Sequence, residues 1–207
     1  WDTYWSVFGF FNLADKYQDD TTKARLIEHA KGNIHNFMDH QLPDGYIPMM
    51  IEVVDWPEPY LNMKHKEGIL MNMHKPFLCQ QIVLISDFID DYSWCSQYFE
   101  NLEKYFECYD NNYYFENCGL YVWCDDIMIG MDNDPATFGR PKFSTANIYL
   151  NSFMCMELDA MVKICGIFGK EERVAYYKEK KEKLVEAIQS ECWDKRDQFF
   201  LFCRCGY

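Results

Sequence analysis

A two-residue connection constrains the fold of this chain more than any other feature of its sequence. Gly169–Lys170 separates two segments of helical periodicity, one from about Ala146 to Phe168 and one from about Glu171 to Cys192. In both segments apolar residues recur at three- and four-residue spacing, as on the buried face of an amphipathic helix. Because so short a connection holds consecutive helices side by side and antiparallel, we expect a helical hairpin here.

Four further helical segments precede this hairpin. The first is predicted from about Tyr4 to Tyr17, and the second follows the cap-like sequence DDTT at Asp19–Thr22. The third opens near Pro76, a residue favoured in a first helical turn, and the fourth carries the apolar positions from Cys95 to Tyr105. Long and short connections alternate between the helices, which indicates an all-α array of stacked helical hairpins with its long loops at one end. An unrelated helical solenoid is the alternative, although no repeat of fixed period supports it.

The two long connections are predicted to carry the function. They run from about Leu42 to Lys66 and from about Asp110 to Thr145, and their many aromatic residues argue against disorder. The second contains GMDNDPATFG, at 130–139. Aromatic rings offer flat apolar surface to a sugar and Asp and Asn bind hydroxyls, so a sugar-sized site is expected at the loop end. Aromatic candidates for its lining, each of which could equally be ordinary core, are Trp1, Trp56, Trp123, Tyr46 and Tyr121.

Several carboxylates crowd the approach to this polar loop. Asp125, Asp126 and Asp132 lie close in the sequence, and Asp134 follows. Like charges held close together raise the pKa of at least one carboxyl group, which lets it donate a proton near neutral pH. The alternatives are an Asx turn or a Ca²⁺ loop, but the central Gly and the bidentate Glu of a calcium loop are missing. The pattern therefore favours a general acid, and no metal is expected.

Composition narrows the class of partner. The formal charge of −13 over 207 residues, without a Lys/Arg cluster, argues against nucleic acid and favours a sugar or a neutral or cationic small ligand. An equally good alternative is that the acidity serves only to keep the protein in solution. No apolar run approaches the about 18 residues of a membrane helix, so no membrane partner is expected. Five of the ten cysteines (Cys79, Cys95, Cys108, Cys155 and Cys165) lie within helical patterns, which predicts a reducing, cytoplasmic location, with disulfides as the alternative. The pair Cys203 and Cys205 is only a weak metal motif.

Six motifs occur together in an order that matches a known family. They are WDTYW (1–5), DGYIP (44–48), HKPFL (74–78), GMDNDP (130–135), YLNSFM (149–154) and CWDKRDQFF (192–200). With them the chain resembles glycoside hydrolase family 63, especially its bacterial mannosylglycerate-hydrolase-like members, and it is more distantly similar to family 37 trehalases. The resemblance, which covers essentially the whole chain, implies an (α/α)6 barrel that hydrolyses α-glycosides with inversion and needs no cofactor.

The resemblance also implies roles for individual residues. Asp132 matches the family's general acid, and Trp1 and Asp2 match the "WD" that holds the sugar in the −1 subsite. His74 and Lys75 stand where relatives carry the Gln and the first Pro of a "QPP" stretch, so this chain departs from the family there. Together with the aromatic Trp123, the predicted substrate-binding residues are Trp1, Asp2, His74, Lys75, Asn151 and Asp126.

One catalytic group has no counterpart in the sequence. Inverting hydrolysis needs a general base about 6.5–9.5 Å from the acid, and the resemblance places that Glu in the C-terminal half of the barrel. We therefore predict that residues 1–207 form one partial (α/α)6 catalytic domain, about half of the barrel, of an inverting α-glucosidase or α-mannosidase. The isolated chain, expected to be a fragment, is predicted to be inactive. The alternative is a non-catalytic half-barrel that binds sugar or a protein partner and self-associates through exposed apolar edges.

Overall fold

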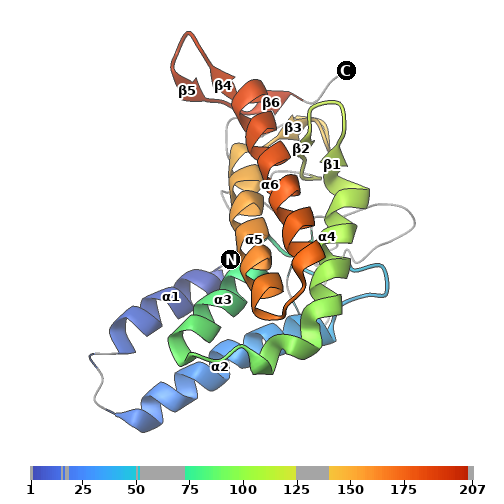
Figure 1. Cartoon of the computed structure of the whole chain (residues 1–207). Helices are drawn as coiled ribbons and strands as arrows, with labels where there is room; N and C mark the ends of the chain where they lie inside the picture. The colour runs from blue at the N-terminus through green and yellow to red at the C-terminus, as the bar shows by residue number, and fades with distance from the viewer. Residues whose placement is uncertain are drawn as a thin grey trace, which may run out of the picture.

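The computed structural model describes residues 2–14, 16, 19–49, 51, 73–124 and 140–204. Within these ranges the fold is all-α, as predicted, with helical hairpins arranged as in part of an (α/α)6 toroid (Figure 1). Its helices are α1 (Asp2–Ala14), α2 (Asp20–Asp39), α3 (Leu78–Ile89), α4 (Phe99–Tyr113), α5 (Ile148–Ile167) and α6 (Glu171–Glu191), and the 3-10 helix η1 (Ser93–Tyr98) precedes α4.

The antiparallel hairpin of α5 and α6 is confirmed (Figure 1). Gly169 adopts a left-handed conformation with φ of 65°, and the N–H of Lys170 donates to the carbonyl of Cys165 at 2.9 Å. A residue with a side chain would be strained at this φ, so glycine both ends α5 and turns the chain. Helix α6 buries Tyr177 and Leu184, and the ring of Tyr177 packs against Phe106 of α4 with centroids 5.2 Å apart.

The start of α2 follows its predicted cap, α5 has a cap that was not predicted, and the start of α3 departs from the prediction. Asp19 caps α2, because its carboxylate accepts from the N–H groups of Thr21 and Thr22, and Asn147 caps α5 in the same way. Helix α3 begins at Leu78, so Pro76 lies before the helix and not in its first turn. The N-cap position of α3 belongs to Phe77, whose side chain cannot accept a hydrogen bond.

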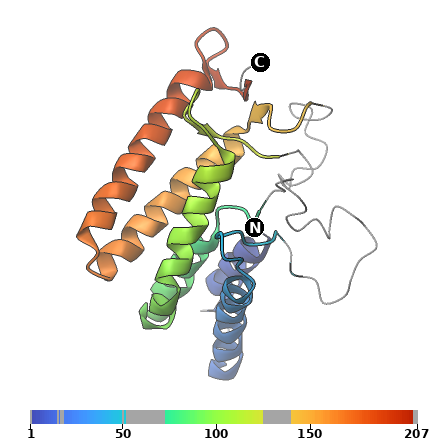
Figure 2. The same cartoon turned by 90° about the vertical axis from the view of Figure 1, so that its right-hand side faces the viewer.

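Short β pairs mark one end of the helical array. All are antiparallel: β1 (Tyr114–Phe115) pairs with β2 (Leu120–Tyr121), β3 (Thr145–Ala146) with β6 (Cys203–Arg204), and β4 (Trp193–Asp194) with β5 (Phe199–Phe200). They lie at the end of the α5–α6 hairpin opposite its Gly169 turn (Figures 1 and 2). The described parts of the second long connection therefore gather at this end, called the loop end below.

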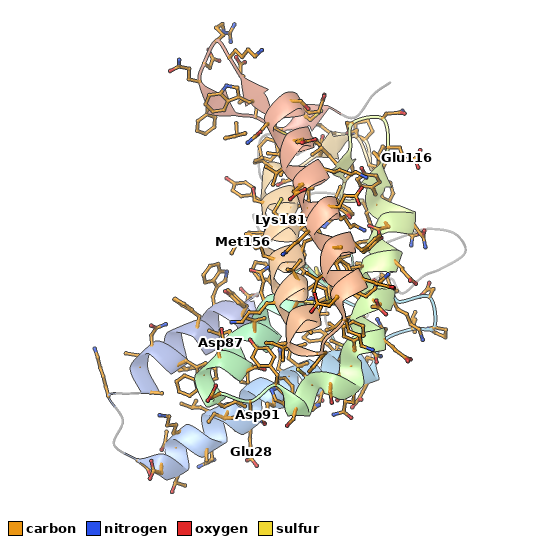
Figure 3. The ribbon with its side chains drawn as sticks, viewed as in Figure 1. Glu28, Asp87, Asp91, Glu116, Met156 and Lys181 are labelled. Carbon is orange, nitrogen blue, oxygen red and sulfur yellow. The ribbon has the colours of Figure 1, made fainter. Side chains whose placement is uncertain are left out.

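The core runs through the interface of α3, α4, α5 and α6. Buried tyrosines of α4, Tyr105, Tyr109 and Tyr113, follow one another at four-residue spacing and are fully enclosed. At the surface, Lys163 of α5 pairs with Asp87 of α3 at 2.6 Å, and Asp87 is labelled in Figure 3. In the part of the chain that the structure describes, no helix combines the length and hydrophobicity that a bilayer crossing requires.

Helix α1 exposes several large aromatic side chains. Phe11 stacks on Phe88 of α3 with ring centroids 4.1 Å apart, whereas Trp5, Phe8 and Phe10 are each about half exposed. Exposed aromatic residues in such number are unusual for a monomer. They are the natural candidates for the expected self-association, which stays a prediction.

Candidate functional site

The segment from His74 to Phe77 is held by two tyrosines of α4. The hydroxyl of Tyr105 donates to the carbonyls of His74 at 2.8 Å and Lys75 at 2.9 Å, and that of Tyr109 donates to His74 at 2.7 Å. The N–H of His74 donates to the carbonyl of Ile47 at 2.8 Å, which ties together the two sides of the first long connection. The main chain at the predicted substrate-binding positions is therefore fixed by buried groups.

His74 is an enclosed, neutral imidazole. It is 5% exposed, and burial lowers the pKa of the ring from 6.5 to about 3. Its Nδ1 lies 2.7 Å from the carbonyl of Lys75, which can only accept, so Nδ1 carries the proton. The ring packs edge-on against Phe37 of α2, with centroids 4.3 Å apart. Lys75 is also buried, at 6% exposed.

A carboxylate from α5 completes the start of α3. Oε1 of Glu157 accepts from the N–H of Cys79 at 2.7 Å, and Oε2 accepts from the N–H of Gln80 at 3.1 Å. Glu157 is fully buried, and burial raises its pKa from 4.5 to about 7 although the hydrogen bonds from Cys79 and Gln80 oppose that shift. A buried carboxylate of this kind takes the place of the side-chain cap that Phe77 cannot provide.

The side chain of Asn151 on α5 makes three hydrogen bonds to the main chain around it. Its Oδ1 accepts from the N–H of Tyr121 at 2.8 Å, and its Nδ2 donates to the carbonyls of Tyr121 and Asn147, both at 2.9 Å. The hydroxyl of Tyr121 in turn donates to Asp110 at 2.7 Å, and Asp110 pairs with Lys180 of α6. Asn151 therefore clamps β2 onto the first turn of α5.

The segment 125–139 leaves and rejoins the described chain at one place. The N–H of Phe143 donates to the carbonyl of Cys124 at 3.0 Å, and the N–H of Val122 donates to that of Tyr113 at 2.8 Å. Between them Trp123 is buried, and its indole N–H has no acceptor among the described residues, although the hydroxyl of Tyr109 is its polar neighbour. Both ends of the polar loop are thus anchored at the loop end, beside α4.

The structure brings part of the predicted site together. His74, Lys75, Trp123 and Asn151 all lie around the α4 tyrosines and the first turns of α5. Asp2 is the exposed first residue of α1. Among the predicted lining residues, Tyr46 and Tyr121 are buried. The predicted residues that lie outside the described ranges are Trp1, Trp56, Asp125, Asp126, Asp132 and Asp134.

Glu157 is absent from the residues predicted above, although the sequence around it carries a signal. Glu157 lies between Met154 and Met161 at helical spacing, on the apolar face of α5. A charged residue at such a position is almost never buried unless polar groups satisfy it.

The described residues contain no group of three or more His, Cys, Asp or Glu that could hold a metal ion.

Comparisons with known proteins identify the family. No curated protein matches the chain. A solved structure of a protein named "Sialidase" is similar in fold, with a TM-score of 0.55 and 21% sequence identity over 61% of this chain and 11% of that chain. This chain thus spans a small part of the sialidase, and the likeness concerns the fold alone. The model of the mannosylglycerate hydrolase MGH1-like glycoside hydrolase domain matches residues 27–205, and the chain therefore belongs to this family of glycoside hydrolase domains.

Proposed function

We propose that the protein containing this domain hydrolyses α-glucosides or α-mannosides with inversion, and that Asp132 is its general acid. The observation that carries the proposal is the family match over residues 27–205, which includes GMDNDP at 130–135. The anchoring of Cys124 to Phe143 supports it, because both ends of the acid-bearing segment lie near Tyr113, at the end of the α4 helix whose Tyr105 and Tyr109 hold His74.

In the proposed reaction, Asp132 protonates the glycosidic oxygen as the bond to the leaving group breaks. A water molecule attacks the anomeric carbon from the opposite face, and a carboxylate about 6.5–9.5 Å from the acid removes its proton. The proposal assigns no residue of the 207 to this base, so the isolated chain is expected to be inactive.

Glu157 is not a candidate for either catalytic role. A pKa of about 7 would suit a general acid. Its side chain is fully buried, however, and both oxygens already accept hydrogen bonds from the main chain of α3. A substrate could reach neither oxygen without unfolding the start of that helix.

The substrate-binding part of the proposal concerns His74, Lys75, Trp123 and Asp2. His74 and Lys75 belong to a main-chain segment that two buried tyrosines hold, so their position is set before a ligand arrives. Trp123, whose indole N–H faces the hydroxyl of Tyr109, is proposed to line the sugar site. Asp2 is proposed to hold the sugar from the start of α1.

The general acid is tested by leaving groups of different quality. In the full-length protein, Asp132→Asn is expected to lower kcat by about 10²–10⁴-fold on alkyl glycosides, whose leaving oxygen must be protonated. Hydrolysis of the corresponding α-glycosyl fluorides should fall far less, because fluoride leaves without a proton. Asp134→Asn makes the same change of charge two positions away and is the matched control. Equal loss on both substrate types would refute the role of Asp132 as a proton donor.

The anomeric configuration of the released sugar is a separate test, which concerns the inverting mechanism. Proton NMR of the earliest product should show the β-anomer of the released sugar, because inversion of an α-glycoside yields β. Initial release of the α-anomer would contradict the inverting mechanism. Sugar binding without hydrolysis of any α-glycoside would support the non-catalytic alternative.

A further inference from the structure

We propose that Glu157 is a positioning residue for the site: from inside α5 it fixes the N-terminus of α3 and, through it, the segment His74–Phe77. The inference rests on the proposed function in one respect, because His74 and Lys75 are substrate-binding residues only in that proposal. The mechanical part of the inference stands on the contacts of Glu157 alone.

The start of α3 depends on an acceptor from elsewhere. The first N–H groups of any helix lack partners within it, and here Leu78, Cys79 and Gln80 are all buried, away from water. Glu157 lies 78 residues from Cys79 in the sequence, yet its two oxygens meet the two N–H groups of Cys79 and Gln80. The partial positive charge at this helix end also favours the carboxylate.

The start of α3 is in turn joined to the preceding segment. Nε2 of Gln80 donates to the carbonyl of Pro76 at 2.6 Å, and the N–H of Phe77 donates to that of Lys75 at 2.7 Å. The same Nε2 of Gln80 also donates to the carbonyl of Phe153 on α5 at 3.3 Å. Glu157 therefore holds one end of a unit whose other end is held by the α4 tyrosines.

The surroundings explain why this position needs a carboxylate. Two donors require two acceptor oxygens, whereas a Gln side chain offers one oxygen and places an NH2 group against the second N–H. The titratable groups that face Glu157 are Tyr4 of α1, Cys79 of α3, and Tyr105 and Tyr109 of α4. Burial raises the pKa of each, so all four are neutral near pH 7 and none is a cation. The two N–H groups are thus the principal groups that hold the carboxylate in place.

Hydrogen exchange measured by mass spectrometry tests the inference in the full-length protein. Glu157→Gln is expected to accelerate exchange of the peptide covering residues 73–80 by at least tenfold. Asp159→Asn is the matched control: Asp159 lies across α5 from Glu157 and pairs at the surface with Lys181, labelled with Met156 in Figure 3, at 2.6 Å. Exchange in Glu157→Gln within twofold of the wild type would overturn the inference.

A measurement on the wild type covers the case in which Glu157→Gln does not fold. The amide NMR signals of Cys79 and Gln80 should move together with a single midpoint as Glu157 titrates between pH 5 and 9. Amide signals in the middle of α2, which Glu157 does not contact, are the reference. If the two amides do not shift in concert over this range, Glu157 does not cap α3 and the inference is wrong.

Kinetics distinguish this inference from the proposed function. With α-glucosyl and α-mannosyl fluorides as probes, Glu157→Gln should raise KM about tenfold and change kcat less than threefold, and Asp159→Asn should change neither. An unchanged KM would overturn the link to substrate binding. If the wild type hydrolyses neither fluoride, the proposed function fails, and the exchange experiment still decides the inference.

Discussion

The buried side chains of Glu157 and His74 are expected to make opposite contributions to the pH dependence of stability, and these contributions should cancel. Burial raises the pKa of Glu157 from 4.5 to about 7, and burial lowers that of His74 from 6.5 to about 3. Between about pH 4.5 and 6.5, the folded domain therefore holds a proton on Glu157 that the unfolded chain has released. Over the same range the unfolded chain holds a proton on His74 that the folded domain lacks.

Each group alone would give a clear slope. A raised carboxyl pKa contributes stability that is fully present below pH 4.5 and is lost as the pH rises through about 7. A lowered histidine pKa has the opposite sign, because stability present above pH 6.5 is lost as the pH falls. One proton corresponds to about 1.4 kcal/mol per pH unit, so the two slopes offset each other between pH 5 and 6.

Removal of either group should expose the slope of the other. In Glu157→Gln, the free energy of unfolding is expected to rise with pH by about 1.4 kcal/mol per unit relative to the wild type. In His74→Gln, the free energy of unfolding should fall with pH by about 1.4 kcal/mol per unit relative to the wild type. Loss of the cap also lowers the stability of Glu157→Gln at every pH, by about 1–3 kcal/mol for a buried hydrogen bond, and that offset does not change the slope.

Urea unfolding of the domain, followed by tryptophan fluorescence at pH 5.0, 5.5 and 6.0, measures these slopes. Asp159→Asn and His40→Gln are the controls, because they change an acid and a histidine that lie at the surface. Both controls should parallel the wild type. Parallel behaviour of Glu157→Gln and His74→Gln as well would refute the reasoning, since it would mean that neither buried group has a displaced pKa.

Smaller perturbations test the local geometry by thermal or urea unfolding. Gly45→Ala should cost about 2–3 kcal/mol or more, because Gly45 has φ of 88° and an added Cβ would lie 2.0 Å from the carbonyl oxygen of Lys104. Gly32→Ala, in the open interior of α2, should instead stabilise by about 0.4–1 kcal/mol. Asn151→Ala should cost about 3 kcal/mol, since buried main-chain groups lose their partners. Asp19→Ala should cost about 1 kcal/mol through loss of the α2 cap.

The features that the sequence predicted well are local ones. The α5–α6 hairpin follows from Gly169–Lys170, because a short connection and a left-handed glycine leave one arrangement. The cap of α2 follows from Asp19, whose side chain acts on N–H groups two and three residues ahead. Signals of this kind depend only on neighbours in the chain, so they can be recognised before any tertiary contact is known.

The features that the sequence did not reveal depend on distant contacts. Pro76 is a common first-turn residue, but α3 begins later because its first free N–H groups meet a carboxylate from α5. The resemblance assigns Asn151 to the substrate, and its side chain makes three hydrogen bonds to the main chain of Tyr121 and Asn147. Its proposed contact with a sugar stays a prediction. The structure adds a second role, the attachment of β2 to α5, which no local sequence pattern indicates.

Helix α5 emerges as the common support of the site. Asn151 holds the strand that leads to the segment of Asp132, and Glu157, within about two turns of Asn151, holds the helix that follows His74. Both long connections are therefore anchored to α5. The spacing of Asn151 and Glu157 along this helix sets the distance between the two anchors. A substitution in the buried face of α5 should disturb both loops together, whereas one in α2 should reach the site through the contact of Phe37 with His74 and through the hydrogen bond from Asn33 to Gln81 of α3. An arrangement of this kind keeps Cys124, where the segment of the proposed acid begins, in register with the proposed sugar-binding residues His74 and Lys75, because both depend on contacts with α5.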